Sequence, residues 1–227
     1  MHSVSRAITT TQEGPHDDLA RRVQRARDSA WQRPPAAHTQ AAFAEADTWL
    51  AQRQQPLVLD AGCGVGLSTR QLAERFPTHA VIGVDRSEDR LSRDHGELPD
   101  NALLVRADLV DFWRLAGAAG WQPARHFLLY PNPYPKKTQL KKRWHGHPVF
   151  PALVGLGGTL ELRTNWAIYA QEFAQGVRLL TGLDGTLSRH DPDGAFLTPF
   201  ERKYHLSGQA LWRYRVELPS PQPGGTA

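Results

Sequence analysis

The sequence has few of the features that mark exported or membrane-bound proteins. Its 227 residues include a single cysteine, Cys63, which excludes an internal disulfide. No apolar run reaches the roughly 18 residues that a membrane-spanning helix needs. The polar first residues also lack the apolar stretch of a signal peptide. We therefore expect a cytoplasmic protein with no membrane partner.

Lysine is scarce as well, and its distribution is uneven. Of only five lysines, four lie within one short segment: Lys136, Lys137, Lys141 and Lys142. The formal net charge of +4 is compatible with a nucleic-acid partner but does not require one. The basic chemistry is thus concentrated at one place in the chain.

Two further shortages limit the possible chemistry. His145 and His147 have no other ligand types at a suitable spacing, so no metal site is expected. Cys63 lies between two glycines and has no acid–base partner nearby, which favours a small residue in a tight turn over a nucleophile.

Short apolar runs alternate with amphipathic stretches, and this alternation predicts a doubly wound α/β fold. Strands are expected at 56–62, 80–85, 102–108, 126–131, 158–165, 185–190 and 210–218. Helices are expected at 17–32, 38–54, 68–76, 87–95, 109–119, 148–156 and 166–181, with Thr39 as the N-cap of the second. The pattern predicts a mostly parallel seven-stranded sheet with an antiparallel edge strand and helices on both faces. Residues 1–38 would form a mobile tail and a helical extension, and residues 219–227 a disordered tail.

Glycines crowd the first strand-to-helix turn, which reads "LVLDAGCGVG". A dinucleotide-binding turn needs G-x-G-x-x-G, but its third glycine would fall at Leu67. The D-x-G-x-G-x-G pattern instead resembles the first motif of class I S-adenosylmethionine-dependent methyltransferases. The residues of this pattern are Asp60, Gly62, Gly64 and Gly66.

Two acids follow the next two predicted strands. Asp85 ends the second strand, where a carboxylate accepts hydrogen bonds from ribose hydroxyls, and Asp108 ends the third, beside the expected adenine. Each acid taken alone is equally well explained as the cap of the helix that follows it. Together with the glycine pattern they favour S-adenosylmethionine as the cofactor.

The segment "YPNPYPKKTQLKKR" follows the fourth predicted strand, so it lies at the carboxyl edge of the sheet beside the cofactor. Its three prolines stiffen the backbone, so that Asn132 and Tyr134 are held in place, and the ring of Tyr134 can stack on a base. The basic residues after them can bind phosphates, although a solvated basic loop is the alternative. These residues are Lys136, Lys137, Lys141, Lys142 and Arg143.

Three motifs in order resemble the bacterial tRNA (guanine-N7)-methyltransferase family over roughly residues 40–217. The family loop P-D-P-W-P-K-K corresponds to "PNPYPKK", its T-D followed by W and Y corresponds to "TNWAIY", and its T-x-F-E corresponds to "TPFE". The resemblance implies a class I methyltransferase domain at 39–218, tRNA or another structured RNA as partner, and a monomer or homodimer. It also implies substrate contacts by Thr164, Asn165, Thr198 and Glu201, although Thr198 and Glu201 also fit a capping box.

Two departures from the family pattern leave alternatives open. Asn132 and Asn165 stand where the family has aspartates, and an amide accepts fewer guanine donors than a carboxylate does. The asparagine also resembles the N-P-P-Y motif of amino-directed methyltransferases acting on another nucleic acid or a protein. A non-catalytic RNA-binding relative of the fold is the third interpretation.

Asn132 and Tyr134 are the expected catalytic residues for methyl transfer to guanine N7 in tRNA.

Overall fold

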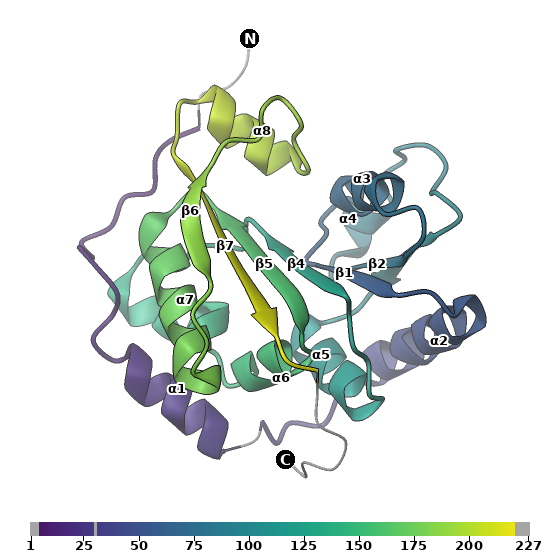
Figure 1. Cartoon of the computed structure of the whole chain (residues 1–227), viewed down its shortest axis with the longest axis horizontal. Helices are drawn as coiled ribbons and strands as arrows, with labels where there is room; N and C mark the ends of the chain where they lie inside the picture. Colours follow the sequence, from purple (N-terminus) through teal and green to yellow (C-terminus); the bar gives the residue numbers. More distant parts are fainter. Residues whose placement is uncertain (1–4, 30, 221–227) are drawn as a thin grey trace.

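A computed structural model describes residues 5–29 and 31–220 and contains one seven-stranded sheet in the order β3-β2-β1-β4-β5-β7-β6 (Figure 1). The strands are β1 (Leu57–Ala61), β2 (Ala80–Asp85), β3 (Ala102–Arg106), β4 (Arg125–Leu129), β5 (Gly158–Thr164), β6 (Thr186–His190) and β7 (Leu211–Leu218). β1 to β5 pair in parallel, whereas β7 is antiparallel to both β5 and β6. The predicted fold class is confirmed, with the antiparallel strand inserted one place in from the edge.

Helices lie on both faces of this sheet, but unevenly. They are α1 (Leu19–Asp28), α2 (Ala37–Arg53), α3 (Leu67–Arg75), α4 (Glu88–Leu91), α5 (Leu109–Ala118), α6 (Phe150–Gly155), α7 (Ala167–Thr181) and α8 (Pro199–Leu206), with 3-10 turns η1 (Lys137–Lys142) and η2 (Trp144–Gly146). The main core contains buried side chains of α1, α2, α5, α6 and α7 on one face, and a smaller core lies under α3 on the other. In Figure 1, α8 stands over the end of the sheet at which β5 and β6 finish.

The strands form where the sequence predicts them because their side chains are almost continuously apolar. Every residue of β1 and β2 is buried, as expected for parallel strands covered on both faces. Their carboxyl ends therefore meet at one edge of the sheet, and this edge carries the glycine turn, Asp85 and the loop after β4.

Local predictions fail at two places where tertiary contacts decide the outcome. Thr39 is not an N-cap: it lies inside α2, and its hydroxyl accepts a hydrogen bond from the Asp108 N–H at 3.3 Å. The helix expected at 87–95 ends at Leu91. A turn follows, in which Asp94 accepts from the N–H of Gly96 at 2.8 Å.

The regions outside the predicted helices and strands hold more structure than expected. α8 forms within the loop expected between the last two strands. Residues 5–16 belong to the expected mobile tail, but hydrogen bonds hold them against α7, α8 and the loop after β4. In the described part of the chain, no helix is long and apolar enough to cross a membrane. The predicted disordered tail lies largely in 221–227, outside the described residues.

Candidate functional site

The glycine turn after β1 uses backbone conformations that side chains disfavour. Gly62, Gly64 and Gly66 have φ of 82°, 61° and 79°. A Cβ on Gly66 would lie 2.8 Å from Leu104 Cδ1, whereas a Cβ on Gly64 would meet no atom within 4 Å. Gly66 is thus favoured mainly by its positive φ, because a Cβ there would displace only the end of the Leu104 side chain, and Gly64 leaves a bare backbone surface that a ligand can approach.

Asp60 supports this turn from beneath. Its side chain is 1% exposed, and Oδ2 accepts hydrogen bonds from Ser68 Oγ at 2.6 Å and Thr69 Oγ1 at 2.8 Å. Burial raises the pKa of Asp60 to about 6, against the opposing effect of these two hydroxyls. Oδ1 is buried with no hydrogen-bond partner among the described residues, and the predicted role of Asp60 in the cofactor site stays a prediction.

Asp85 and Asp108 flank the turn, and both combine a structural role with spare acceptor capacity. Asp85 accepts from Gly64 N at 3.0 Å and from Ser87 N at 2.9 Å, one bond at each oxygen. Asp108 caps α5 by accepting from Val110 N at 2.8 Å through Oδ1. Because a carboxylate oxygen can accept two hydrogen bonds, both acids keep acceptor capacity, but Asp85 is only 6% exposed and Arg90 Nη1 lies 3.6 Å from its Oδ2. Binding of S-adenosylmethionine along the bare glycine surface between these two acids stays a prediction.

The loop after β4 places Asn132 and Tyr134 at the same edge. Tyr130 and Tyr134 have φ of 51° and 45°, a left-handed conformation that is uncommon for aromatic residues. Asn132 is exposed, and its Oδ1 accepts from the Tyr134 N–H at 3.4 Å. The Lys142 ammonium lies 5.6 Å from the centroid of the Tyr134 ring and covers one of its faces. Stacking on a base would use the other face.

The basic segment divides into two parts with different roles. The side chains of Lys136, Lys137, Lys141 and Lys142 are exposed around η1. Arg143 is 0% exposed, and its Nε and Nη2 both donate to the Tyr134 carbonyl at 3.1 Å. The expectation that Arg143 binds phosphate is therefore wrong, because its donors are used inside the protein.

Glu172 of α7 neutralises this buried arginine. Arg143 Nη1 donates to both Glu172 carboxylate oxygens, at 2.8 and 2.6 Å, and His145 Nε2 lies 2.7 Å from Oε2. Burial opposes ionisation of Glu172, but the bonds from His145 and Arg143 outweigh it and lower its pKa to about 2. Burial lowers the pKa of His145 itself, so the neutral ring donates through Nε2 and its Nδ1 has no partner among the described residues. We call Glu172, Arg143, His145 and Gln12 the Glu172 cluster.

Glu201 of α8 forms a second buried cluster of the same kind. It is 0% exposed and accepts from Arg163 Nη1 at 2.9 Å, Tyr130 Oη at 2.9 Å and Leu197 N at 2.7 Å, with His190 Nε2 at 3.1 Å. Despite burial, the His190 and Arg163 contacts lower the pKa of Glu201 to about 2. The predicted direct contact of Glu201 with substrate is wrong, since its carboxylate is enclosed by protein donors.

The remaining predicted substrate residues also serve the fold. Thr198 is the N-cap of α8 and accepts from the Glu201 N–H at 2.9 Å. Thr164 is buried and accepts from the Trp166 N–H at 3.2 Å. Asn165 is half-buried and donates through Nδ2 to Gln209 Oε1 at 2.8 Å. For Thr164 and Thr198, burial leaves little surface for a substrate, and the contact by Asn165 stays a prediction.

The residues that sequence reasoning missed are Glu172, Gln12, Thr10 and Tyr130. Glu172 had a signal: it falls next to Phe173 on the apolar face of its helix, where a charge requires a buried partner. The sequence gives no such signal for Gln12 and Thr10, because their segment has no periodicity.

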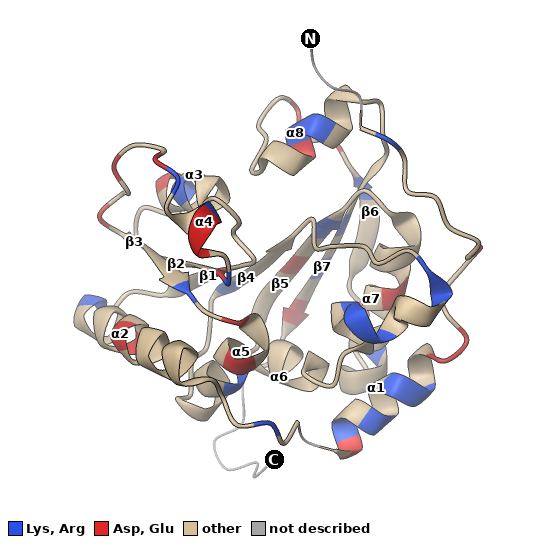
Figure 2. Ribbon diagram, turned by 180° about the vertical axis from the view of Figure 1, so that it is seen from behind, with Lys and Arg blue, Asp and Glu red and all other residues tan. Residues whose placement is uncertain are grey.

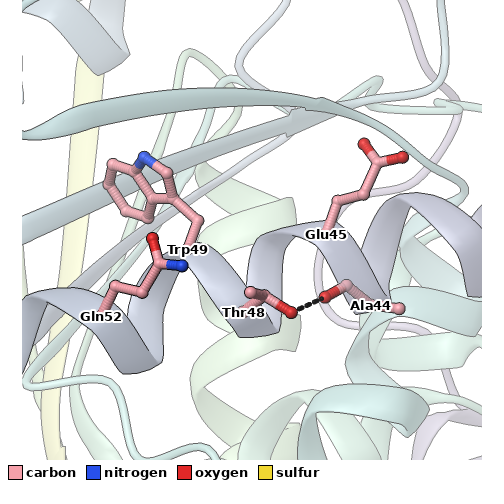
Figure 3. Close-up of a pocket in the computed structure, with 5 residues that line it drawn as sticks. All are labelled: Ala44, Glu45, Thr48, Trp49 and Gln52. Carbon is pink, nitrogen blue, oxygen red and sulfur yellow. Dashed lines mark hydrogen bonds between the residues drawn. The ribbon is translucent and has the colours of Figure 1, made fainter.

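Away from this edge, the described residues contain a hollow. The shallow hollow, of about 430 Å³, lies on α2 and is lined by Ala44, Glu45, Thr48, Trp49 and Gln52 (Figure 3). None of these residues belongs to the glycine turn or to the loop after β4. Within 5–29 and 31–220, no group of three or more His, Cys, Asp or Glu side chains is arranged to hold a metal ion.

Comparison with known proteins connects this geometry to one family. Residues 54–214 match the Methyltransf_4 family model, described as "Putative methyltransferase". A tRNA (guanine-N(7)-)-methyltransferase of Acidithiobacillus ferrooxidans is 30% identical over 178 residues, covering 73% of this chain and 76% of that protein. A protein of the same name from Mycobacterium avium is 32% identical over 190 residues, covering 75% and 69%.

Solved structures share the fold at much lower identity. The 16S rRNA methyltransferase KamB superposes with a TM-score of 0.58 at 16% identity, covering 82% of this chain and 95% of that one. The 16S rRNA (adenine(1408)-N(1))-methyltransferase of Catenulisporales acidiphilia, solved with its cosubstrate SAM, gives 0.53 at 17% identity, covering 80% and 93%. These matches establish the class I methyltransferase fold.

Proposed function

The chain belongs to the Methyltransf_4 family of S-adenosylmethionine-dependent methyltransferases, and on this premise we propose that it methylates N7 of a guanine in tRNA. One juxtaposition carries the proposal: the glycine turn with Asp85 and Asp108 shares an edge with the loop that bears Asn132 and Tyr134. The names of relatives at 30% and 32% identity support tRNA as the acceptor.

The cofactor half supplies binding and orientation. Asp85 would accept from the ribose hydroxyls and Asp108 Oδ2 from the adenine amine, while the bare backbone at Gly64 would lie against the methionine part. When bound, S-adenosylmethionine supplies an electrophilic methyl group. The protein's task is to fix the direction from which the acceptor approaches, because displacement at this carbon requires an in-line attack.

The acceptor half needs no general base. Guanine N7 carries a lone pair and no proton, so no proton must be removed before the attack. The ring of Tyr134 would stack on the base, and the amide of Asn132 offers an acceptor and two donors. The exposed lysines of η1 would contact phosphates and make the affinity salt-dependent.

The test incubates the purified chain with labelled cofactor and tRNA lacking modification, followed by nucleoside mass spectrometry. We expect label in 7-methylguanosine. Label in a methylated amino group would instead support the amino-directed interpretation, and cofactor binding without incorporation would support a non-catalytic RNA-binding protein.

The variant Asn132→Asp sharpens this test. A carboxylate accepts from both N1–H and the 2-amino group of guanine and stabilises the cationic product, so activity on N7 should be retained or rise about 2- to 10-fold. An amino-directed enzyme should lose activity, because the substitution replaces the amide oxygen that would accept a hydrogen bond from the target NH₂ with a charged carboxylate. Asn165→Asp tests the second departure from the family pattern in the same way, because Asn165 also stands where the family has an aspartate.

A further inference from the structure

Residues 5–16 contain no helix or strand, yet they are hydrogen-bonded from end to end, and we call them the N-terminal strap. At α8, Ser5 N donates to Ser207 Oγ and Gln209 Nε2 donates to Ser5 O, both at 2.9 Å. At α7, the His16 N–H donates to Glu172 Oε1 at 2.9 Å. The strap is the purple trace that descends along the left of Figure 1, from α8 towards α1.

Between these ends the strap contacts the loop after β4. Thr10 Oγ1 donates to the Pro135 carbonyl at 2.7 Å and accepts from the Gln12 N–H at 3.0 Å. Gln12 is 6% exposed. Its Nε2 donates to Glu172 Oε1 at 2.5 Å and its Oε1 accepts from Arg143 Nη2 at 3.0 Å. Gln12 is therefore a full member of the Glu172 cluster.

The loop depends on these outside partners because of its composition. Pro131, Pro133 and Pro135 have no N–H, so the loop has few backbone donors of its own. Its carbonyls are bound by side chains instead. Arg143 donates to the carbonyls of Tyr134 at 3.1 Å and Lys136 at 3.4 Å, and Thr10 binds the carbonyl between them. The carbonyls of Tyr134 and Pro135 are thus bound by one arginine that the strap helps to hold and by one residue of the strap, whereas the Lys136 carbonyl also accepts from the Gln139 N–H at 2.9 Å.

We propose that the N-terminal strap is a positioning element of the acceptor site, in which Thr10 and Gln12 fix the loop that presents Asn132 and Tyr134. Tyr134 has φ of 45°, a strained conformation that persists only when its surroundings hold it. Releasing the carbonyls of Tyr134 and Pro135 allows the backbone of Tyr134 to relax. Its ring then no longer holds the base in the orientation that in-line transfer needs. The effect on rate rests on the proposed function, whereas the effect on the loop does not.

The run Thr9-Thr10-Thr11 provides matched controls. Thr9 and Thr11 are exposed and make no side-chain hydrogen bond within the described residues, whereas Thr10 makes two. The test compares Thr10→Val and Gln12→Met with Thr9→Val and Thr11→Val. It uses hydrogen exchange in peptides covering 130–143, the affinity for S-adenosylmethionine, and turnover on unmodified tRNA.

We expect Thr10→Val and Gln12→Met to raise exchange in these peptides about 5- to 10-fold, and to lower kcat by a similar factor. Cofactor affinity should stay within about twofold, because neither residue contacts the glycine turn or Asp85. The two control variants should match the wild type in all three measurements.

The outcomes separate this inference from the proposed function. If exchange in 130–143 is the same in all four variants, the strap does not fix the loop and the inference fails. If exchange rises but kcat does not change, the loop is held for stability alone, and the positioning role fails. A wild type that binds cofactor and leaves tRNA unmethylated would overturn the proposed function, and the exchange measurements would still decide whether the strap holds the loop.

Discussion

At the proposed cofactor side of the carboxyl edge, which is the glycine turn, the backbone determines most of the local structure. At the proposed acceptor side, which is the loop after β4, buried charges determine it. The glycine turn consists of left-handed glycines with one hydroxyl-bonded aspartate beneath it. The acceptor side rests on two buried clusters, each containing a glutamate, an arginine and a histidine around Glu172 and Glu201. In Figure 2, α8 carries both basic and acidic segments above the sheet, and α7 lies on the side of the sheet away from α3.

The difference reflects what each side must hold. A turn that binds through backbone needs residues without side chains, and its conformational cost is reduced locally by glycine. A proline-rich loop has few backbone donors, so its conformation must be imposed by side chains from elsewhere. Such side chains are buried and charged here, so each is stable only while its partners remain.

The largest effect on the fold is expected from breaking the Glu172 cluster. Glu172→Gln leaves the buried Arg143 guanidinium without a countercharge and should lower the free energy of unfolding by about 3–5 kcal/mol. Urea unfolding measures this. Glu74→Gln, at an exposed position of α3, is the control and should stay within about 0.5 kcal/mol. Equal effects of the two substitutions would show that Arg143 does not need the charge of Glu172.

The stability contributed by Asp60, beneath the glycine turn, should fall as pH rises, which is opposite to the pH dependence of the two buried glutamates. The pKa of Asp60 is raised to about 6 from 3.8, so the folded state binds its proton more tightly than the unfolded state does. The stabilising contribution of this group is complete below about pH 4 and is lost as pH rises through 6, a change of about 3 kcal/mol. Between pH 4 and pH 7, the free energy of unfolding of Asp60→Asn should therefore rise by about 3 kcal/mol relative to that of the wild type. Urea unfolding at a series of pH values measures this difference.

Glu172 and Glu201 provide the contrast to Asp60. Their pKa values are lowered to about 2 from 4.5, so their contribution to stability is present above about pH 4.5 and is lost as pH falls towards 2.

Parallel stability curves for the wild type and Asp60→Asn across pH 4 to 7 would show that Asp60 keeps an ordinary carboxyl pKa.

Substituting the glycines separates packing from binding within the turn. Gly66→Ala combines a positive φ with a Cβ 2.8 Å from the movable end of the Leu104 side chain and should lower the free energy of unfolding by about 2–3 kcal/mol. Gly64→Ala meets no atom within 4 Å and should cost only about 1–2 kcal/mol for its φ. Calorimetry should nevertheless show that Gly64→Ala weakens S-adenosylmethionine binding about tenfold or more, because its methyl group fills the ligand's surface. Unchanged affinity would remove Gly64 from the cofactor site.

The smallest effect on the fold is expected from the exposed lysines. Replacing Lys136, Lys137, Lys141 and Lys142 by alanine should change stability by less than about 1 kcal/mol, since their charges face solvent. The same variant should weaken tRNA binding and reduce its salt dependence by about one unit of slope for each phosphate that is no longer neutralised. Lys203→Ala, the fifth lysine, is the matched control on α8. An unaltered salt slope would move the RNA-binding surface away from η1.

The sheet and the cofactor turn could be predicted from the amino-acid sequence alone, because both depend on local patterns. β2 forms at the predicted residues 80–85, and Gly62, Gly64 and Gly66 adopt the positive φ for which glycine is suited. The resemblance to the family likewise rested on short motifs, and the family match supports it.

Which charged residues face solvent was settled only by the packing of the folded chain. Lys142 and Arg143 are neighbours in one basic run, yet one is exposed and the other is 0% exposed against Glu172, which is distant in sequence. No local pattern distinguishes them, because burial of a charge depends on whether a partner arrives from elsewhere in the fold. The same holds for Gln12, which lies in a segment without periodicity. Its contacts with Glu172 and Arg143 exist only in the folded chain, where the sheet and α7 bring these residues together.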